Sequence, residues 1–334
     1  MPLITPPRPY DILALFPELA AFARTAVRFH PRRGNPGIGE SSIGGPLLWP
    51  ADEPWPMCAL EHEDLNDEPL DYIRAKREFL RERDHREELG EKTTYEENHD
   101  RLHELRLEHS SDNYPDYDED APQPLIPVTQ LYYRDVPGLP WSDRYDLLQI
   151  LWCPRDHPDT DTPYNPAFQL RWRCAGEVAS TLADPPRPVI CSDSYLPNVC
   201  VVHPEAVTEY PNTKALPEPL AQRILEWAEK QDLSAAYNWN VAFAPGWKVM
   251  GHGGIWGIID PYPIVCDCGT EQLPLFTASS GEFDGGTGSW QPIEETETGY
   301  RPSDPVEVTI GRGYTLQLYY CPESEHHTSR TEMF

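Results

Sequence analysis

Two stretches of the chain, about two hundred residues apart, carry the same residue types in the same order, and this internal repeat limits the fold more than any other feature. The first stretch contains Ile43-Gly44-Gly45, Trp55-Pro56-Met57-Cys58, Pro124-Leu125 and Leu148-Gln149-Ile150-Leu151-Trp152-Cys153-Pro154. The second contains Gly253-Gly254, Tyr262-Pro263, Cys266, Pro274-Leu275 and Leu316-Gln317-Leu318-Tyr319-Tyr320-Cys321-Pro322. A pattern repeated along a chain is typical of a duplicated structural unit. We therefore predict two related halves.

The predicted secondary structure is rich in short strands. Residues 25–29, 125–133, 147–152 and 168–173 alternate or run apolar between Pro, Gly and Asp, as strands do. The 38 prolines among 334 residues also place much of the chain in extended segments and turns. Helical spacing of apolar residues occurs at 10–24, where Pro17 should split the helix, and at 217–231. The predicted fold class is α+β, with mostly antiparallel sheet.

Residues 59–120 differ in kind from the rest of the chain. Positions 61–120 hold 22 acidic and 9 basic residues. A helix should begin near Pro69 and end at Gly90, and a second should begin at the capping box of Thr94 and Glu97. We interpret this region as a charged, acidic helical hairpin with a linker, inserted into the first half. The predicted organisation is a first half of residues 1–58 and 121–210, the insertion 59–120, and a second half of residues 211–334.

Each half carries cysteines and histidines at corresponding points of the repeat. In the first half, Cys58 and His62 are four residues apart, and so are Cys153 and His157. Zinc in structural sites takes four Cys or His ligands in a tetrahedron, and a pair at this spacing lets one turn supply two of them. These four residues are therefore predicted to form a Cys2His2 zinc site.

The second half offers a set with similar chemistry. Cys266 and Cys268 lie on one short loop, and Cys321 is followed five residues later by His326. We predict that these four residues form a Cys3His zinc site. His327 is the alternative fourth ligand, because it follows His326 directly.

The alternative for both sets is that the cysteines are small core residues and the histidines lie on the surface. Four Cys/His pairs at equivalent points of a repeat favour zinc over that interpretation. Neither set includes a carboxylate or leaves an obvious open coordination position, which indicates a structural and not a catalytic metal. Cys174, Cys191 and Cys200 have no such partners and are predicted to lie in the core.

Sequence motifs for catalysis are scarce. The sequence has neither a Gly-x-Ser-x-Gly nucleophile elbow nor a glycine-rich phosphate loop. Glu282 and Asp284 could act as an acid/base pair, but turn chemistry beside Gly285-Gly286 explains the aspartate without catalysis. We expect no enzyme activity. The alternative is a metal-dependent enzyme that uses the cleft between the halves, with zinc as a Lewis acid.

A net charge of −28 disfavours nucleic acid or an anionic membrane as a partner, because both repel an acidic surface. The chain begins without a charged-then-apolar leader and has no apolar run long enough to span a bilayer, so we expect it in the cytoplasm. We expect a binding module whose protein partner docks on the sheet face or on the acidic hairpin. A basic partner would be steered by the charge. An immunity-type protein that neutralises a basic toxin is one such case.

Several segments resemble the YwqG-like proteins, a bacterial family of unknown function. The most specific is Ser42-Ile43-Gly44-Gly45-Pro46-Leu47-Leu48-Trp49-Pro50, followed by Trp55-Pro56. Further similar segments are Pro127-Val128-Thr129-Gln130-Leu131, Asp146-Leu147-Leu148-Gln149 with Trp152-Cys153-Pro154, Pro245-Gly246-Trp247-Lys248-Val249, and residues 279–290. The charged hairpin departs from the usually short connection of this family. The resemblance implies an α+β fold with extensive antiparallel sheet, and it implies no established activity.

Overall fold

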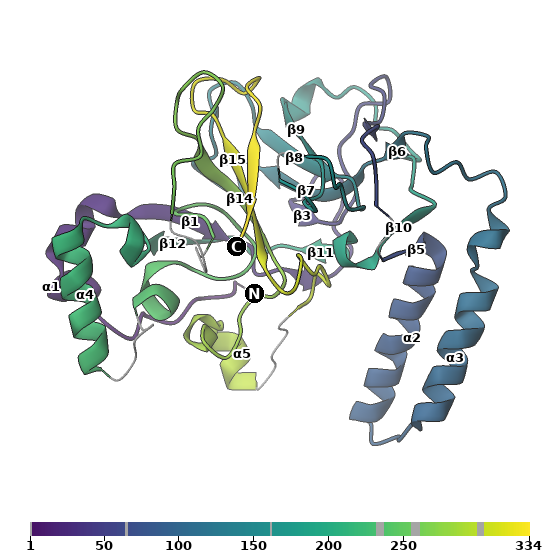
Figure 1. The fold of residues 1–334 in the computed structure, drawn as a ribbon, viewed down its shortest axis with the longest axis horizontal. Coiled ribbons are helices and arrows are strands. Elements are labelled where there is room, and N and C mark those ends of the chain that lie inside the picture. The colour runs from purple at the N-terminus through teal and green to yellow at the C-terminus, as the bar shows by residue number, and fades with distance from the viewer. Residues whose placement is uncertain (1, 64–65, 161, 232–236, 255–260, 299–303) are drawn as a thin grey trace.

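The computed structural model describes residues 2–63, 66–160, 162–231, 237–254, 261–298 and 304–334. Two six-stranded sheets dominate these residues (Figure 1). In spatial order, the first sheet contains β2 (Arg32–Arg33), β11 (Cys200–Val201), β3 (Ser42–Ile43), β7 (Ile126–Tyr132), β8 (Leu147–Trp152) and β9 (Phe168–Arg173). The second contains β12 (Glu205–Glu209), β1 (Arg24–Arg28), β13 (Lys248–Met250), β14 (Leu273–Ser279), β15 (Thr315–Tyr320) and β16 (Arg330–Met333).

The two sheets repeat one pattern. Each of these neighbouring strand pairs is antiparallel, and the run β3, β7, β8, β9 has the same spatial order as β13, β14, β15, β16, although the connections differ in length. The second strand of each run is irregular at the same point, between Pro127 and Thr129 in β7 and between Pro274 and Phe276 in β14. Pro127, and not Pro124, is therefore the structural counterpart of Pro274. The α+β class is confirmed, and the two sheets share this strand order.

The two halves share strands and a core. The predicted boundary at residue 210 does not separate the sheets, because β1 and β12 lie before it in the chain and complete the second sheet. One hydrophobic cluster joins Val27, Trp152, Trp247 and Phe276, which come from both sheets. The halves are thus layers around a common core.

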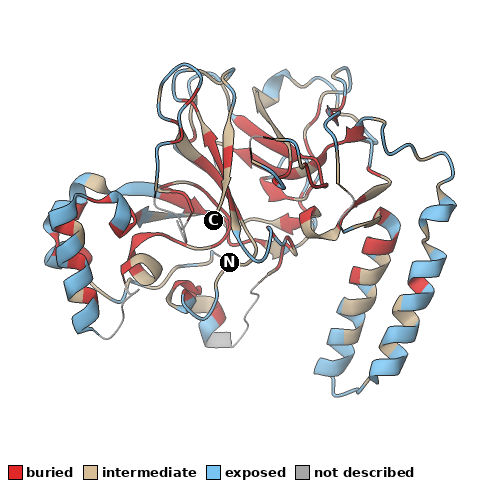
Figure 2. Cartoon of the chain, viewed as in Figure 1, coloured by how far each residue is buried: buried red, intermediate tan, exposed pale blue. Residues whose placement is uncertain are grey.

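The inserted hairpin leaves the body between two short strand pairs. These are β4 (Met57–Cys58) with β6 (Gln123–Pro124), and β5 (Asp67–Pro69) with β10 (Ile190–Ser192). Helices α2 (Leu70–Glu88) and α3 (Tyr95–Glu108) follow β5 and project from the sheets (Figure 1). Most of their surface is exposed away from the root (Figure 2).

Local sequence signals set the ends of this hairpin. Gly90 adopts a left-handed φ of +85° just after α2, a conformation that costs glycine little. At the start of α3, the backbone N–H of Glu97 donates to Thr94 Oγ1, and the Glu97 carboxylate accepts from the Thr94 N–H. The predicted capping box is confirmed. The root is buried through Ile73 and Arg77.

The remaining helices border the second sheet. Pro17 separates α1 (Ile12–Leu15) from a 3-10 turn at Pro17–Phe22, as predicted. Helix α4 (Glu218–Lys230) buries Leu220 and Ile224 against Phe16 and Leu19 of that N-terminal segment. The short helix α5 (Ile293–Thr298) follows. Across the described residues, no helix combines the length and the apolar character needed to cross a membrane.

Candidate metal centres

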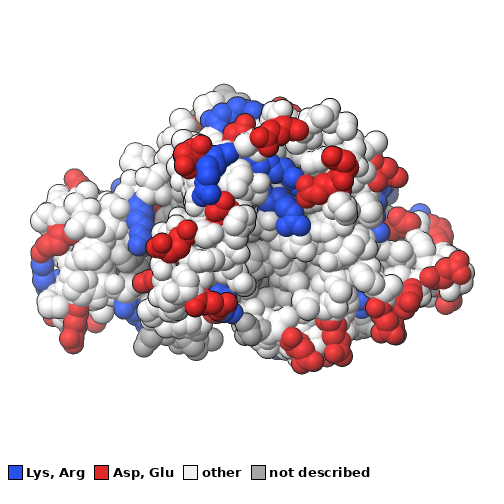
Figure 3. All heavy atoms as spheres, turned by 90° about the horizontal axis from the view of Figure 1, so that it is seen from above, with Lys and Arg blue, Asp and Glu red and all other residues white. Residues whose placement is uncertain are grey.

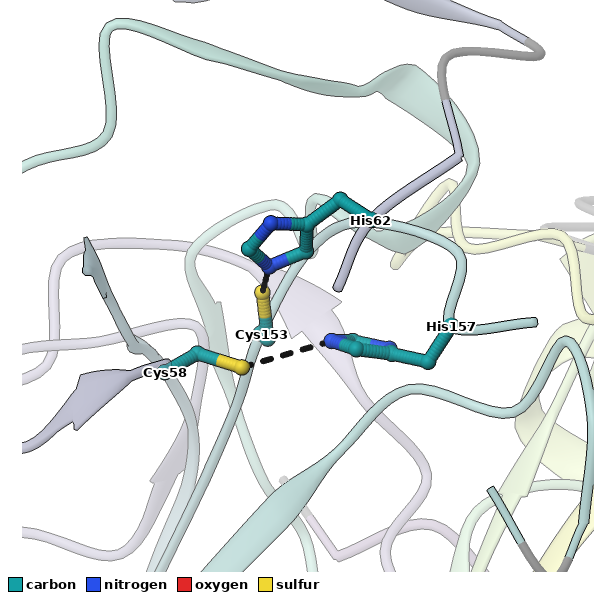
Figure 4. A group of neighbouring side chains, drawn as sticks. All are labelled: Cys58, His62, Cys153 and His157. Atoms are coloured by element: carbon teal, nitrogen blue, oxygen red, sulfur yellow. Dashed lines mark hydrogen bonds between the residues drawn. The ribbon is translucent and has the colours of Figure 1, made fainter. Parts of the chain in front are cut away.

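The first predicted set of ligands comes together where β4 and β8 end. Cys58 closes β4 and Cys153 directly follows β8, so the strand pairing fixes both sulfurs. The Sγ atom of Cys58 lies 3.3 Å from Nε2 of His157, and the Sγ atom of Cys153 lies 3.3 Å from Nε2 of His62. Figure 4 shows the four side chains converging on one point. All four ligand atoms lie within 4.8 Å of one another.

Three of the four ligands of this first centre are buried. Cys153 and His157 are fully buried, Cys58 is 5% exposed, and His62 is half-buried. The Nδ1 atom of His157 lies 3.3 Å from the carbonyl oxygen of Asn165, which directs the other ring nitrogen toward the sulfurs. Such an outer hydrogen bond commonly orients a metal-binding imidazole.

The second centre occupies the equivalent place in the other half. It joins Cys266 and Cys268, from the loop before β14, to Cys321, the residue after β15, and to His327. The Nδ1 atom of His327 lies 3.2 Å from Sγ of Cys321 and 3.7 Å from Sγ of Cys266. The sulfurs of Cys268 and Cys321 are 3.6 Å apart, and both thiols are free.

The histidine of this second set differs from the first choice made from spacing. His326 is not among the converging ligands: its side chain is 84% exposed and lies beside Glu325. Glu325 is itself held by Arg144, whose guanidinium lies 2.6 Å from the carboxylate. The ion pair of Arg144 and Glu325 anchors the loop at the residue before His326. His326 therefore points outward, and His327 turns toward the sulfurs. The alternative ligand left open by the sequence is the one that the structure brings into place.

Backbone N–H groups support the sulfurs in both centres. Four thiols accept a hydrogen bond from the residue two positions later, and these pairs are Cys58 with Leu60, Cys153 with Arg155, Cys268 with Thr270, and Cys321 with Glu323. A donor aimed at sulfur favours the thiolate, which is the form that binds metal. The same local arrangement therefore occurs at two cysteines of each centre.

The thiols of the first centre influence one another strongly. The hydrogen bond from Cys153, together with those from His157 and His62, holds the pKa of Cys58 far below its usual range. The same bond to Cys58, followed by burial, raises the pKa of Cys153. In the second centre, hydrogen bonds from Thr270 lower the pKa of Cys268 to about 6. Each centre thus favours one thiolate even before a cation arrives.

The spacing of the ligand atoms fits a tetrahedral ion. Bonds of about 2.3 Å to sulfur and about 2.0–2.1 Å to nitrogen place tetrahedral ligands roughly 3.4–3.8 Å apart. The described separations run from 3.2 to 3.7 Å. Both clusters could therefore hold a metal ion with little rearrangement.

The segment between two ligands of the first centre also fastens the inserted hairpin. Arg155 is buried between Cys153 and His157; its Nε donates to Asp67 in β5, and its Nη1 donates to Tyr117 beyond α3. The backbone carbonyl oxygen of the neighbouring Asp156 accepts the N–H of Glu63. Neither ligand spacing nor hydrophobic periodicity in the sequence indicates this link. The only signal for it is a charged Arg-Asp pair inside a Cys-Pro-x-x-His segment.

The other residues considered from sequence have structural roles. Cys191 and Cys200 are buried as predicted, whereas Cys174 is only half-buried. Asp284 accepts hydrogen bonds from the N–H groups of Gly286 and Thr287, which is the predicted turn chemistry. Glu282 is buried and accepts the N–H of Trp247.

No protein-family model matches this chain, and no curated protein sequence is similar to it. The resemblance to the YwqG-like proteins therefore rests on the segments quoted above.

Proposed function

We propose that this protein is a cytoplasmic, non-enzymatic binding module that holds one structural zinc ion in each half and presents the inserted hairpin to a protein partner. The observation that carries the metal part is the position of the two clusters. Each forms where the third strand of the repeated run ends, and each has four protein ligands.

The donor chemistry supports zinc. One centre offers two sulfurs and two imidazole nitrogens, and the other offers three sulfurs and one nitrogen. Thiolate and imidazole in a tetrahedron are the ligands typical of structural zinc, whereas magnesium and calcium prefer oxygen. Four protein ligands also complete the coordination sphere, which leaves no position for a reacting water.

The placement of the ligands supports a stabilising role. In the first centre, one pair begins at the last residue of β4 and the other follows β8, so an ion would join segments almost a hundred residues apart. In the second centre, the loop before β14 is joined to the segment after β15. An ion that cross-links distant segments lowers the free energy of the folded state relative to the unfolded chain.

The hairpin has the properties of a docking element. Its root is fixed by Arg77, which donates to Asp193 and to the carbonyl oxygens of Leu196 and Glu307. Its far end exposes Leu89 and Tyr95. Figure 3 shows acidic side chains at the end of the molecule where Figure 1 places the hairpin and its linker, while Lys and Arg gather near the middle of that face. A basic partner would meet the acidic end first.

Metal content per chain tests the first part of this proposal. We expect near two zinc ions in the protein purified without a metal-affinity tag, and near one in either Cys153→Ser or Cys321→Ser, measured by mass spectrometry. Cys200→Ser is the matched control, because Cys200 is buried outside both centres, and it should keep two ions. Wild-type protein without zinc would overturn the proposal.

A shortened hairpin tests the second part. Replacing residues 81–97 by a short Gly/Ser turn removes the projecting end and leaves Arg77 and the root in place. We expect two zinc ions and an unchanged sheet core, with loss of the protein that cross-links to the wild-type chain in its source cells. An identical set of cross-linked proteins would contradict the docking role of the hairpin.

A further inference from the structure

A cavity of about 720 Å³ lies on the face of the second sheet that is turned away from the shared core. Its floor consists of residues that face the same way on adjacent strands, namely Lys248 of β13, Thr277 and Ser279 of β14, and Thr315 of β15. Neighbouring residues such as Val249, Phe276 and Leu316 point into the core instead. The volume is typical of a small-molecule site.

Four aromatic side chains line this cavity. They come from separate segments and are Trp239, Phe283, Tyr314 and Phe334. Tyr314 is 42% exposed, and Trp239, Phe283 and Tyr314 belong to no hydrophobic cluster of the described residues. Aromatic surface that the core does not use, gathered around one hollow, is typical of a binding site for a flat or apolar ligand.

Glycines keep the wall of the cavity open. Gly253 has a left-handed φ of +79°, and a Cβ on Gly254 would lie 2.7 Å from the ring of Phe334. Gly313, with a φ of +97°, has open space where its Cβ would be. A side chain at Gly254 would displace Phe334, and one at Gly253 would press against Gln317 and Pro274. The backbone here is therefore shaped around a space.

The equivalent face of the first sheet is covered by the chain itself. There Gln130 Oε1 accepts the N–H of Leu48, and Gln149 donates to the Leu48 carbonyl oxygen. In the second sheet the corresponding pair is Thr277 and Gln317, and the Thr277 hydroxyl donates to Gln317. On the floor of the cavity, the shorter side chain of Thr277 thus stands where the first sheet has Gln130. The residues that directly follow Gly254 lie outside the described part, and the site is defined without them.

The charges that line the cavity select its ligand. Lys248 is the only basic residue among the described lining residues, and it is paired with Glu209, with 2.5 Å between Nζ and Oε1. The carboxylates are Asp284, which is bonded within its own turn, and Asp304, which accepts the N–H of Glu307. Burial raises the pKa of Asp304 to about 6, because a charged carboxylate is poorly solvated there. A cation would restore the lost solvation, and an anion would be repelled.

We propose that this cavity binds a small organic cation with an aromatic or similarly flat apolar body, its rings against Tyr314 and Phe283 and its ammonium group toward Asp304. Aromatic faces attract cations as well as apolar groups, so both parts of such a ligand find a partner. The site needs neither metal ion, and it goes beyond the proposed role of the hairpin.

Three probes of similar size and different charge test this proposal. They are phenethylamine, 2-phenylethanol and 3-phenylpropanoate, titrated into the full-length zinc-loaded protein and followed by ligand-detected NMR. We expect the amine to bind at least about fivefold more tightly than the alcohol, and the propanoate most weakly. Fragments of this size ordinarily bind with affinities in the millimolar range. Absence of binding by all three probes up to about 10 mM would therefore overturn the proposal.

Variants separate the two parts of the site. Tyr314→Ala should weaken the amine and the alcohol alike, whereas Asp304→Asn should remove the preference for the amine and leave the alcohol unchanged. Tyr95→Ala, on the exposed end of the hairpin, is the control and should bind like wild type. Equal binding of all three probes, or a preference that survives Asp304→Asn in a protein of unchanged thermal stability, would also overturn it.

Discussion

The guanidinium of Arg155 lies 2.6 Å from the carboxylate of Asp67, and both side chains are almost fully buried. Arg155 stands between two metal ligands, and Asp67 stands at the foot of the hairpin. The position of α2 is therefore connected to the first centre through one ion pair. A buried pair of this kind costs more to break than an exposed one.

Arg155→Ala should loosen the hairpin. The substitution leaves the buried Asp67 without its arginine, and we expect a loss of about 3–5 kcal/mol in the free energy of unfolding. Amide hydrogen exchange in α2 and α3 should rise more than in β7 and β8. Arg106→Ala is the control, because its exposed pair with Glu68 should contribute about 0–1 kcal/mol. Equal exchange in the hairpin of wild type and Arg155→Ala would refute the link.

Substitution can identify which histidine is the fourth ligand of the second centre. His327→Ala should remove one of four ligands and lower the zinc content toward one ion per chain, because the three remaining sulfurs do not complete the tetrahedron. His326→Ala should keep two ions, since that side chain is exposed. Mass spectrometry of both variants decides between them, and the reverse result would assign the ligand to His326.

The two centres should lose metal at different rates. Cys268 is exposed and His327 is half-buried, whereas the first centre buries three of its four ligands. A chelator therefore reaches the second ion more easily. Stopped-flow release into a chromogenic chelator should be faster from Cys153→Ser, which keeps only the second ion, than from Cys321→Ser, which keeps only the first. Equal release rates would show that the difference in burial does not control access.

Acid should destabilise the protein through His252. Burial lowers the pKa of this imidazole to about 4, and its Nε2 donates to the Phe22 carbonyl oxygen. The unfolded chain, with a pKa near 6.5, binds this proton first. Stability is therefore full above about pH 6.5 and falls as the pH drops toward 4, by on the order of 3 kcal/mol from this group.

Urea unfolding at several pH values measures that effect. His252→Gln should show a smaller loss between pH 6.5 and 4.5 than wild type, because the titrating group is gone. His85→Gln, on the exposed face of α2, should follow wild type. Comparing the variants under the same conditions removes the contribution of zinc loss, which acid also causes in all three. Identical slopes for His252→Gln and wild type would refute the assignment.

Local chemistry was predicted well from the sequence. Pro17 splits the N-terminal helix, and Thr94 caps α3, because each signal acts through its immediate neighbours. Seven of the eight residues named as metal ligands converge, since Cys58, Cys153 and Cys321 lie at strand ends that the repeat itself defines and Cys266 and Cys268 share one short loop.

The remaining features depend on distant contacts. The sequence could not show that β1 joins the second sheet, because strand pairing is decided by partners far along the chain. His327 replaces His326 because Arg144, from the first half, holds Glu325. The matching Pro-Leu pairs in the sequence made Pro124 the predicted equivalent of Pro274, whereas the strand register shows that the equivalent residue is Pro127. Each of these outcomes needs information that neither spacing nor periodicity contains.

The short loop of the second centre occupies the place where the first half carries its hairpin. Between Val265 and Glu271 the chain closes a tight turn, with the Cys266 N–H donating to the Thr270 carbonyl oxygen. Gly269 at its tip has open space around the position of a Cβ. The first half shows that the 62 residues 59–120 can enter this kind of loop while β4 and β6 on either side remain paired. Gly269 is therefore a natural graft point, where a reporter domain or a second recognition arm could be spliced into the chain for protein engineering.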